Sequence, residues 1–195
     1  MKKALMIVLL CMGLLLSACA AAESNDPAPF STGAPQSSPG PVLPAEITDG
    51  ASAVYCSWLD EARGFLLRCG YPAIGQMPKA LYRTLDGQNW EPVRELSAVI
   101  PNYPKGLFFW SESRGVILTN YHGAENCVFV TQDGGDTWEA VPFDLHSEFP
   151  VYNYLEAERA WLENGSVMVE LSVHFEDGDP QRITRPLPIA EPVSP

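Results

Sequence analysis

One short stretch of the sequence concentrates side chains that could do chemistry. Residues 131–138 read TQDGGDTW, with paired threonines, aspartates and glycines and a closing tryptophan. Asp133 and Asp136 could give oxygens to a calcium ion, or Asp133 could act as a catalytic carboxylate. Calcium takes about six to eight oxygen ligands, and this stretch offers few. We therefore favour a third interpretation, in which the stretch is a structural turn.

A shortened copy of this stretch occurs 47 positions earlier, at residues 84–90 (TLDGQNW). It keeps four positions of the pattern: Thr84, Asp86, Gly87 and Trp90. Upstream of the two copies, residues 58–65 read WLDEARGF and residues 110–116 read WSESRGV. A period near 45–50 residues, with short flanks rich in aromatic and branched residues, predicts β-propeller blades rather than helical repeats. No stretch of the domain shows a sustained helical period, so we expect an all-β fold.

The pattern resembles the Asp-box (BNR repeat) of sialidase-like β-propellers, Ser/Thr-x-Asp-x-Gly-x-Thr-Trp. The matching positions are Thr131, Asp133, Gly135, Thr137 and Trp138. The arrangement also resembles propellers related to photosystem II assembly factors. Residues 155–161 and 175–181 match a third repeat poorly. The resemblance implies BNR/Asp-box β-propeller-like repeats in about three antiparallel blades, either incomplete or closed by oligomerisation.

In such a box the residues have structural roles. The aspartate is expected to accept hydrogen bonds from the backbone amides that follow it. The glycines permit positive φ, and the tryptophan covers the turn while its indole N–H finds an acceptor.

The chain begins with features of a secreted lipoprotein. Lys2 and Lys3 precede an apolar run at residues 4–16, which is short for a membrane span of roughly 20 residues. The tetrapeptide LSAC resembles the bacterial lipobox, which implies a signal peptide at 1–18 and lipidation of Cys19. An ordinary secretory signal cleaved nearby is the alternative. Residues 19–50, rich in proline, serine and alanine, predict a disordered tether, which leaves 51–195 as the β-propeller-like domain. The expected location is the extracytoplasmic face of a membrane.

The net charge limits the class of partner, and the cysteine positions raise the question of a disulfide. The net charge of −12 disfavours nucleic acid as a partner, because phosphate binding depends on lysine and arginine. Cys56 and Cys69 face each other if the hairpin turn centres between Ala62 and Arg63, and a disulfide then fits. Two buried thiols are the open alternative, because a shift of register separates the pair. Cys127 shows no evident partner.

The sequence offers no recognisable catalytic or metal-binding motif. The three histidines lie far apart without ligand spacing, and we expect neither a metal nor a cofactor. Arg63, Arg114 and Arg159 recur at one repeat position, in the turn after the first strand. Each has an acidic neighbour (Glu61, Glu112 and Glu158), so local ion pairing is a simpler interpretation than an arginine patch that docks a partner.

A ligand surface, by analogy with propellers, is expected on loops opposite the Asp-boxes. These loops are residues 71–79, 101–106, 121–126 and 144–150, and their candidate contact residues are Tyr71, Tyr103, Tyr121 and His122. Packing against neighbouring blades is the alternative for these side chains. We thus predict a lipid-anchored cell-surface binding or scaffold module with an unknown protein or glycan partner, and possible homo-oligomerisation. The alternatives are a sialidase-like carbohydrate-active enzyme and an assembly factor for a membrane complex.

Overall fold

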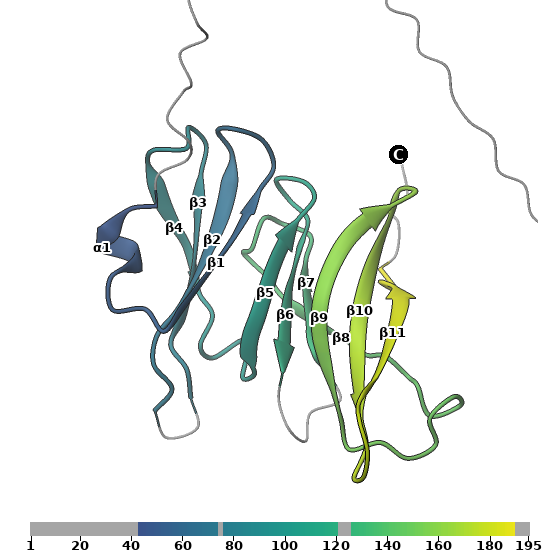
Figure 1. Ribbon diagram of the computed structural model, residues 1–195. Coiled ribbons are helices and arrows are strands. Elements are labelled where there is room, and N and C mark those ends of the chain that lie inside the picture. The colour runs from purple at the N-terminus through teal and green to yellow at the C-terminus, as the bar shows by residue number, and fades with distance from the viewer. Residues whose placement is uncertain (1–42, 74–75, 121–125, 190–195) are drawn as a thin grey trace, which may run out of the picture. The chain divides into compact units, whose positions relative to one another are not determined.

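The computed structural model describes residues 43–73, 76–120 and 126–189, and these residues form an all-β fold (Figure 1). The prediction of an all-β domain is confirmed. Within the described residues the only helix is α1 (Ala45–Thr48), and none is long and apolar enough to cross a bilayer. The strands are β1 (Ala53–Trp58), β2 (Gly64–Cys69), β3 (Lys79–Thr84), β4 (Trp90–Glu95), β5 (Tyr103–Phe109), β6 (Gly115–Asn120), β7 (Val128–Thr131), β8 (Glu139–Val141), β9 (Tyr154–Glu163), β10 (Ser166–His174) and β11 (Gln181–Pro186).

The strands form three antiparallel groups, which we call blades 1, 2 and 3. Blade 1 is a four-stranded sheet in the order β1-β2-β3-β4, and blade 2 contains β5, β6, β7 and β8 in the same kind of meander. Blade 3 has only β9, β10 and β11. It joins blade 2 through one residue pair, Asn120 opposite Glu156, which makes a seven-stranded sheet. Four-stranded antiparallel blades are the unit of a propeller, so the architecture is an incomplete β-propeller.

Two hydrophobic clusters hold the blades together, and β6 contributes to both. Successive residues of a strand point to opposite faces of the sheet. Ile117 therefore lies in a cluster with Leu67 and Leu81 of blade 1. Its neighbours Val116 and Leu118 lie in the other cluster, which contains the apolar residues of β9 and β10. The run GVIL is buried on both sides, which explains why it reads as continuous rather than alternating.

The short helix α1 packs against the other side of blade 1. Ile47 is buried, and Arg68 on β2 donates from Nε to the Ile47 carbonyl oxygen at 2.7 Å. The predicted tether included these residues, so its predicted end at residue 50 is wrong for residues 43–50. The folded part begins earlier because Ile47 finds an apolar surface to cover.

The register of the first hairpin separates the two cysteines that were considered for a disulfide. Cys56 lies opposite Leu66, and Cys69 lies opposite Ala53. The two cysteines are thus three positions out of register, on opposite faces of the sheet, and Cys56, Cys69 and Cys127 are free thiols. The prediction that Cys56 faces Cys69 is wrong because the turn centres on Glu61. The Asp60 carboxylate accepts the backbone N–H groups of residues 62 and 63 at 2.9 and 2.7 Å and holds the turn at this position.

The third repeat differs from its prediction as well. Residues 155–161 were aligned with hairpin turns, but they lie inside β9. Arg159 is therefore a strand residue and not a turn residue. The turn of this hairpin is formed by Asn164 and Gly165, both with positive φ (+50° and +83°), as the Asn-Gly signal predicts for a two-residue hairpin loop.

Candidate functional site

The TQDGGDTW turn connects β7 and β8 and is held by its own side chains. Thr131 Oγ1 donates to Asp133 Oδ1 at 2.9 Å and accepts the Gly135 N–H at 2.8 Å. The Asp133 carboxylate accepts the backbone N–H and the hydroxyl of Thr137 at 2.8 and 2.5 Å. Trp138 is buried and donates its indole N–H to the Gly135 carbonyl at 2.9 Å. These are the contacts expected of a structural turn.

The TLDGQNW turn between β3 and β4 is built in a similar way. The Asp86 carboxylate accepts the backbone N–H groups of Gln88 and Asn89 at 2.9 and 2.7 Å. Thr84 Oγ1 accepts the Gly87 N–H at 3.0 Å. The Asn89 backbone and side-chain donors hold the pKa of Asp86 well below its usual range. In Asp133, burial alone would raise the pKa, but the Thr137 and Thr131 donors lower it. Both carboxylates therefore stay ionised and engaged in their turns, which does not suit a general acid.

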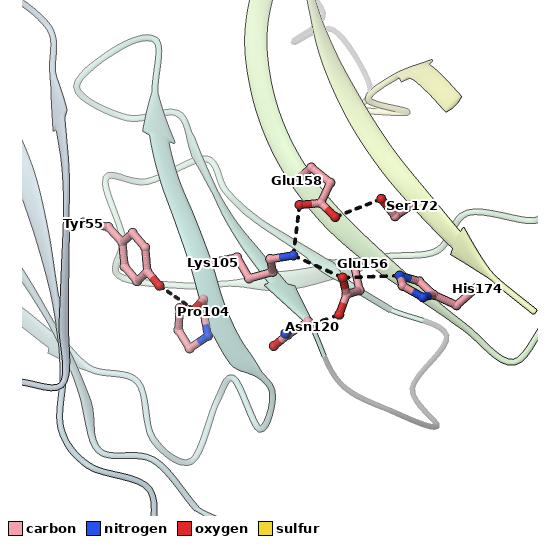
Figure 2. Close-up of polar contacts among 8 residues, drawn as sticks. All are labelled: Tyr55, Pro104, Lys105, Asn120, Glu156, Glu158, Ser172 and His174. Carbon is pink, nitrogen blue, oxygen red and sulfur yellow. Dashed lines mark hydrogen bonds and ion pairs between the residues drawn. The ribbon is translucent and has the colours of Figure 1, made fainter. Parts of the chain in front are cut away.

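A cluster of charged side chains lies where blade 2 meets blade 3 (Figure 2). Lys105 on β5 places Nζ 3.1 Å from Glu156 Oε2 and 2.9 Å from Glu158 Oε2, both on β9. The Lys105, Glu156 and Glu158 side chains are 28, 15 and 24% exposed. Ion pairs so largely removed from water are stronger than surface pairs. Lys105 thus links β5 to β9, although the backbone of each strand pairs with other strands.

Further groups surround the two carboxylates. Ser172 donates to Glu158 Oε1 at 2.8 Å, and Asn120 donates to Glu156 Oε1 at 3.4 Å. His174 Nε2 lies 3.3 Å from Glu156 Oε2 (Figure 2). Nε2 is buried and makes no hydrogen bond to any described residue. The His174 ring stacks on Tyr154, with centroids 4.2 Å apart and planes 12° apart.

The electrostatics of the cluster fit charge pairing rather than proton transfer. Burial alone would raise the pKa of Glu158, but hydrogen bonds from Lys105 and Ser172 outweigh burial and lower it. Burial alone would lower the pKa of Lys105, and the two carboxylates raise it instead. A glycosidase acid needs a raised carboxyl pKa, so Glu158 is not in the state that such a role requires.

The same side of blade 3 carries a second group of polar and aromatic side chains. Arg159 Nη2 lies 2.9 Å from Glu170 Oε2, and its guanidinium sits 4.8 Å from the centroid of the Trp161 ring. The apolar residues of β9 and β10 belong to the core on the opposite side. We define this surface as the blade-3 face; its members are Lys105, Tyr154, Glu156, Glu158, Arg159, Trp161, Glu170, Ser172 and His174.

The arginines of the predicted repeat position do not form one site. Arg63 lies in the β1–β2 turn and pairs with Asp60 and, across to blade 2, with Glu112. Arg159 pairs instead with Glu170 in the middle of blade 3. The simpler interpretation, ion pairing, holds for both arginines, although their partners are not the predicted neighbours Glu61 and Glu158. Arg114 ends the β5–β6 turn and donates its backbone N–H to Ser111 Oγ at 3.0 Å.

The candidate contact residues of the predicted ligand loops have mixed outcomes. Tyr71 is 71% exposed and follows β2, at the end of that strand away from the β1–β2 turn. Tyr103 is half-buried and begins β5 rather than lying in a loop. Tyr121 and His122 lie outside the described residues. Sequence reasoning did not single out Lys105, Glu156 or His174, because no motif or spacing distinguishes them.

Sequence reasoning also missed a concave surface on the turn side, which we call the turn-side groove. It has a volume of about 730 Å³ and lies between the hairpin turns of blades 1 and 2. Its lining consists of Leu59, Arg63, Arg83, Trp110, Ser111, Glu112, Ser113, Asp133 and Gly134. The recurring segments WLDEARG and WSESRG supply most of these residues, so the repeat itself was the available signal.

Comparisons with known proteins give limited similarity. No protein-family model and no curated protein matches the chain. Among solved structures, the chain is similar to one described as "YCF48 bound to D1 peptide", with 12% sequence identity and a TM-score of 0.36. The similarity covers 71% of this chain and 55% of that chain, so this chain spans about half the length of that neighbour. Similarity at this level defines neither a family nor a function.

Proposed function

We propose that the chain is a lipid-anchored, non-catalytic binding module that docks a protein partner through its blade-3 face. The proposal rests on one observation: this face combines aromatic, arginine and histidine side chains in a network of ion pairs, on the side of blade 3 away from its core. Protein interfaces are enriched in aromatic residues and arginine relative to other surfaces.

The charge of the face supports a protein partner. Lys105 and Arg159 face three carboxylates, those of Glu156, Glu158 and Glu170. Arg182 lowers the pKa of Glu158 electrostatically and therefore supplies the third nearby cation. The face is thus close to charge balance on a chain whose net charge is −12. A partner that meets this face avoids the general repulsion that an acidic surface imposes on acidic proteins.

Membrane attachment is the second part of the proposal. Cys19 is the site that the LSAC motif implies for two or more acyl chains, and two chains anchor a protein stably where one does not. Residues between Cys19 and α1 would then connect the lipid to the folded part. Metabolic labelling with an alkyne-tagged fatty acid should mark the wild-type chain, and Cys19→Ala should remove the label and release the chain from membranes.

Site-specific photocrosslinking tests the docking surface. A photoreactive amino acid at position 161 of the full-length, membrane-anchored chain should give a discrete adduct in its native cells. Position 91 is the control, because Glu91 is 65% exposed in its side chain and lies on β4, away from blade 3. An Arg159→Glu change should reduce the adduct at 161. Equal adduct patterns at 91 and 161, unaffected by Arg159→Glu, would contradict the proposal.

A further inference from the structure

The turn-side groove is an open concave surface between blades 1 and 2. Its volume of about 730 Å³ falls within the roughly 300–1,000 Å³ that ligand pockets occupy. Two blades contribute to it: Leu59 and Arg63 come from the β1–β2 turn, while Trp110 and Glu112 come from the β5–β6 turn. It shares no residue with the blade-3 face, and its role is independent of the proposed partner.

Two sets of contacts connect the walls of the groove to each other. The Arg63 guanidinium pairs with Asp60 of its own turn and with Glu112 of the facing blade. Gly134 donates its backbone N–H to the Ser113 carbonyl at 2.8 Å, which ties the TQDGGDTW turn to the β5–β6 turn. Walls held in this way lose little conformational freedom on binding, and this preorganisation favours affinity.

One aromatic side chain forms the flat apolar part of the lining. Trp110 is half-buried and packs against the core between blades 2 and 3. Its ring lies 6.0 Å from that of Phe108, with 28° between the planes. These contacts limit the motion of the indole, part of which lines the groove. Aromatic surfaces of this kind supply a large apolar contact together with a polar edge.

The remaining lining is polar and balanced in charge. Arg63 and Arg83 supply two positive charges, and Glu112 and Asp133 supply two negative ones. The lining also contains the hydroxyl groups of Ser111 and Ser113, 3.4 Å apart. The Arg83 guanidinium lies 3.5 Å from Glu91, a long contact, and its side chain is 49% exposed. The lining thus offers both donors and acceptors beside one aromatic side chain, with no excess of either charge.

We propose that the turn-side groove binds a neutral oligosaccharide, with one pyranose ring stacked on Trp110 and its hydroxyl groups bonded to Arg83, Glu112 and the two serines. A sugar has one apolar face and many hydroxyls that both donate and accept, which matches this lining. An anionic ligand would meet Glu112 and Asp133. A peptide anchored by a side chain needs a desolvated apolar pocket, whereas here Leu59 and Trp110 are the two large apolar side chains in the lining.

Isothermal titration calorimetry of the full chain in detergent tests this assignment. The probes are cellotetraose and fully N-acetylated chitotetraose as neutral sugars, tri-galacturonate as an anionic sugar, and the tripeptide Gly-Tyr-Gly. At least one neutral sugar should bind, and Trp110→Ala should weaken it about tenfold or more, as loss of a binding hot spot does. Trp110→Phe, which keeps a ring, should lose less than Trp110→Ala.

A second variant is needed because Trp110 also packs on the core, so that replacing it also affects the stability of the fold. Arg83→Gln removes an exposed side chain and should weaken sugar binding several-fold with no change in unfolding midpoint. Arg185→Gln is the matched control, with the same loss of charge, because Arg185 lies on β11 outside both the groove and the blade-3 face, and it should bind sugar as the wild type does. Absence of neutral-sugar binding at 10 mM (about 2.7 kcal/mol), or tighter Trp110-dependent binding of tri-galacturonate or Gly-Tyr-Gly, would overturn the assignment.

Discussion

Replacing Gly135 by alanine should destabilise the contact between blades 1 and 2 more than any other glycine change in the turns. Gly135 has φ of +103°, and a Cβ there would lie 2.3 Å from Leu81 Cδ2 on the neighbouring blade. The left-handed backbone costs an alanine about 1–2 kcal/mol. The clash costs a further ~1–3 kcal/mol, as for an overpacked core. The free energy of unfolding should therefore fall by about 2–5 kcal/mol.

Gly178→Ala is the matched control for this prediction. Gly178 has φ of +98°, and a Cβ there would have no atom within 4 Å. Gly178→Ala should therefore lower the free energy of unfolding only by the cost of the left-handed backbone, about 1–2 kcal/mol. Urea denaturation followed by tryptophan fluorescence gives both values, and the difference between them isolates the contact with Leu81.

A double-mutant cycle makes the test specific. Leu81→Ala removes the side chain that the new methyl group would meet, so the cost of Gly135→Ala should shrink by at least about 1 kcal/mol in that background. Gly135→Ala and Gly178→Ala could lower the free energy of unfolding equally, or the effects of Gly135→Ala and Leu81→Ala could simply add. Either result would show that the turn does not pack against blade 1. The docking of this turn between blades would then be wrong.

Three further predictions concern the cluster, the turn and the thiols. Lys105→Met should lower the free energy of unfolding at pH 7 by about 1–3 kcal/mol, between the values for surface and buried pairs. The pKa of Glu158 is lowered from its ordinary value of 4.5, so the stability that its carboxylate gives to the fold is complete above pH 4.5 and is lost as the pH falls through the folded pKa. Urea midpoints measured between pH 7 and 2 should show this loss of stability. The loss should be smaller in Lys105→Met than in the wild type. Asp133→Ala should cost about 1 kcal/mol in urea denaturation by freeing the Thr137 donors, and an unchanged midpoint would refute its role. Cys56 and Cys69 should both react with iodoacetamide after denaturation of the oxidised chain, since they lie on opposite faces, and tryptic peptides joined through a Cys56–Cys69 disulfide would refute the register.

The sequence predicts the turns well because each turn is a local structure. Thr131, Asp133 and Gly135 lie within five residues, and their hydrogen bonds depend on side-chain chemistry and a positive φ. The same reasoning predicts the Asn164–Gly165 turn, whose conformation few other residue pairs adopt. Alternating and branched residues likewise identify the strands.

Strand register and the packing between blades are not local properties, and the sequence patterns did not predict them correctly. The predicted pairing of Cys56 with Cys69 failed because Asp60 bonds the turn backbone and shifts its centre by one to two residues. One such shift changes which residues face each other along the whole hairpin. The cluster around Lys105 joins residues about 50 and 70 positions apart in the chain, and no sequence spacing encodes such a meeting.

The outer sides of blade 1 and blade 3 differ in structure, and this difference limits how a second copy of the chain could close the propeller ring. At blade 1, α1 covers the free side through Ile47 and its bond from Arg68. At blade 3, the free side is polar and its charges are already paired. Ring closure between copies would bring these two sides together, so it would require α1 to leave its site and expose Ile47, which is buried there. Burying apolar surface is the main gain of folding, and displacing α1 forfeits part of it. The predicted closure by oligomerisation therefore carries a cost that docking a partner on the blade-3 face alone does not.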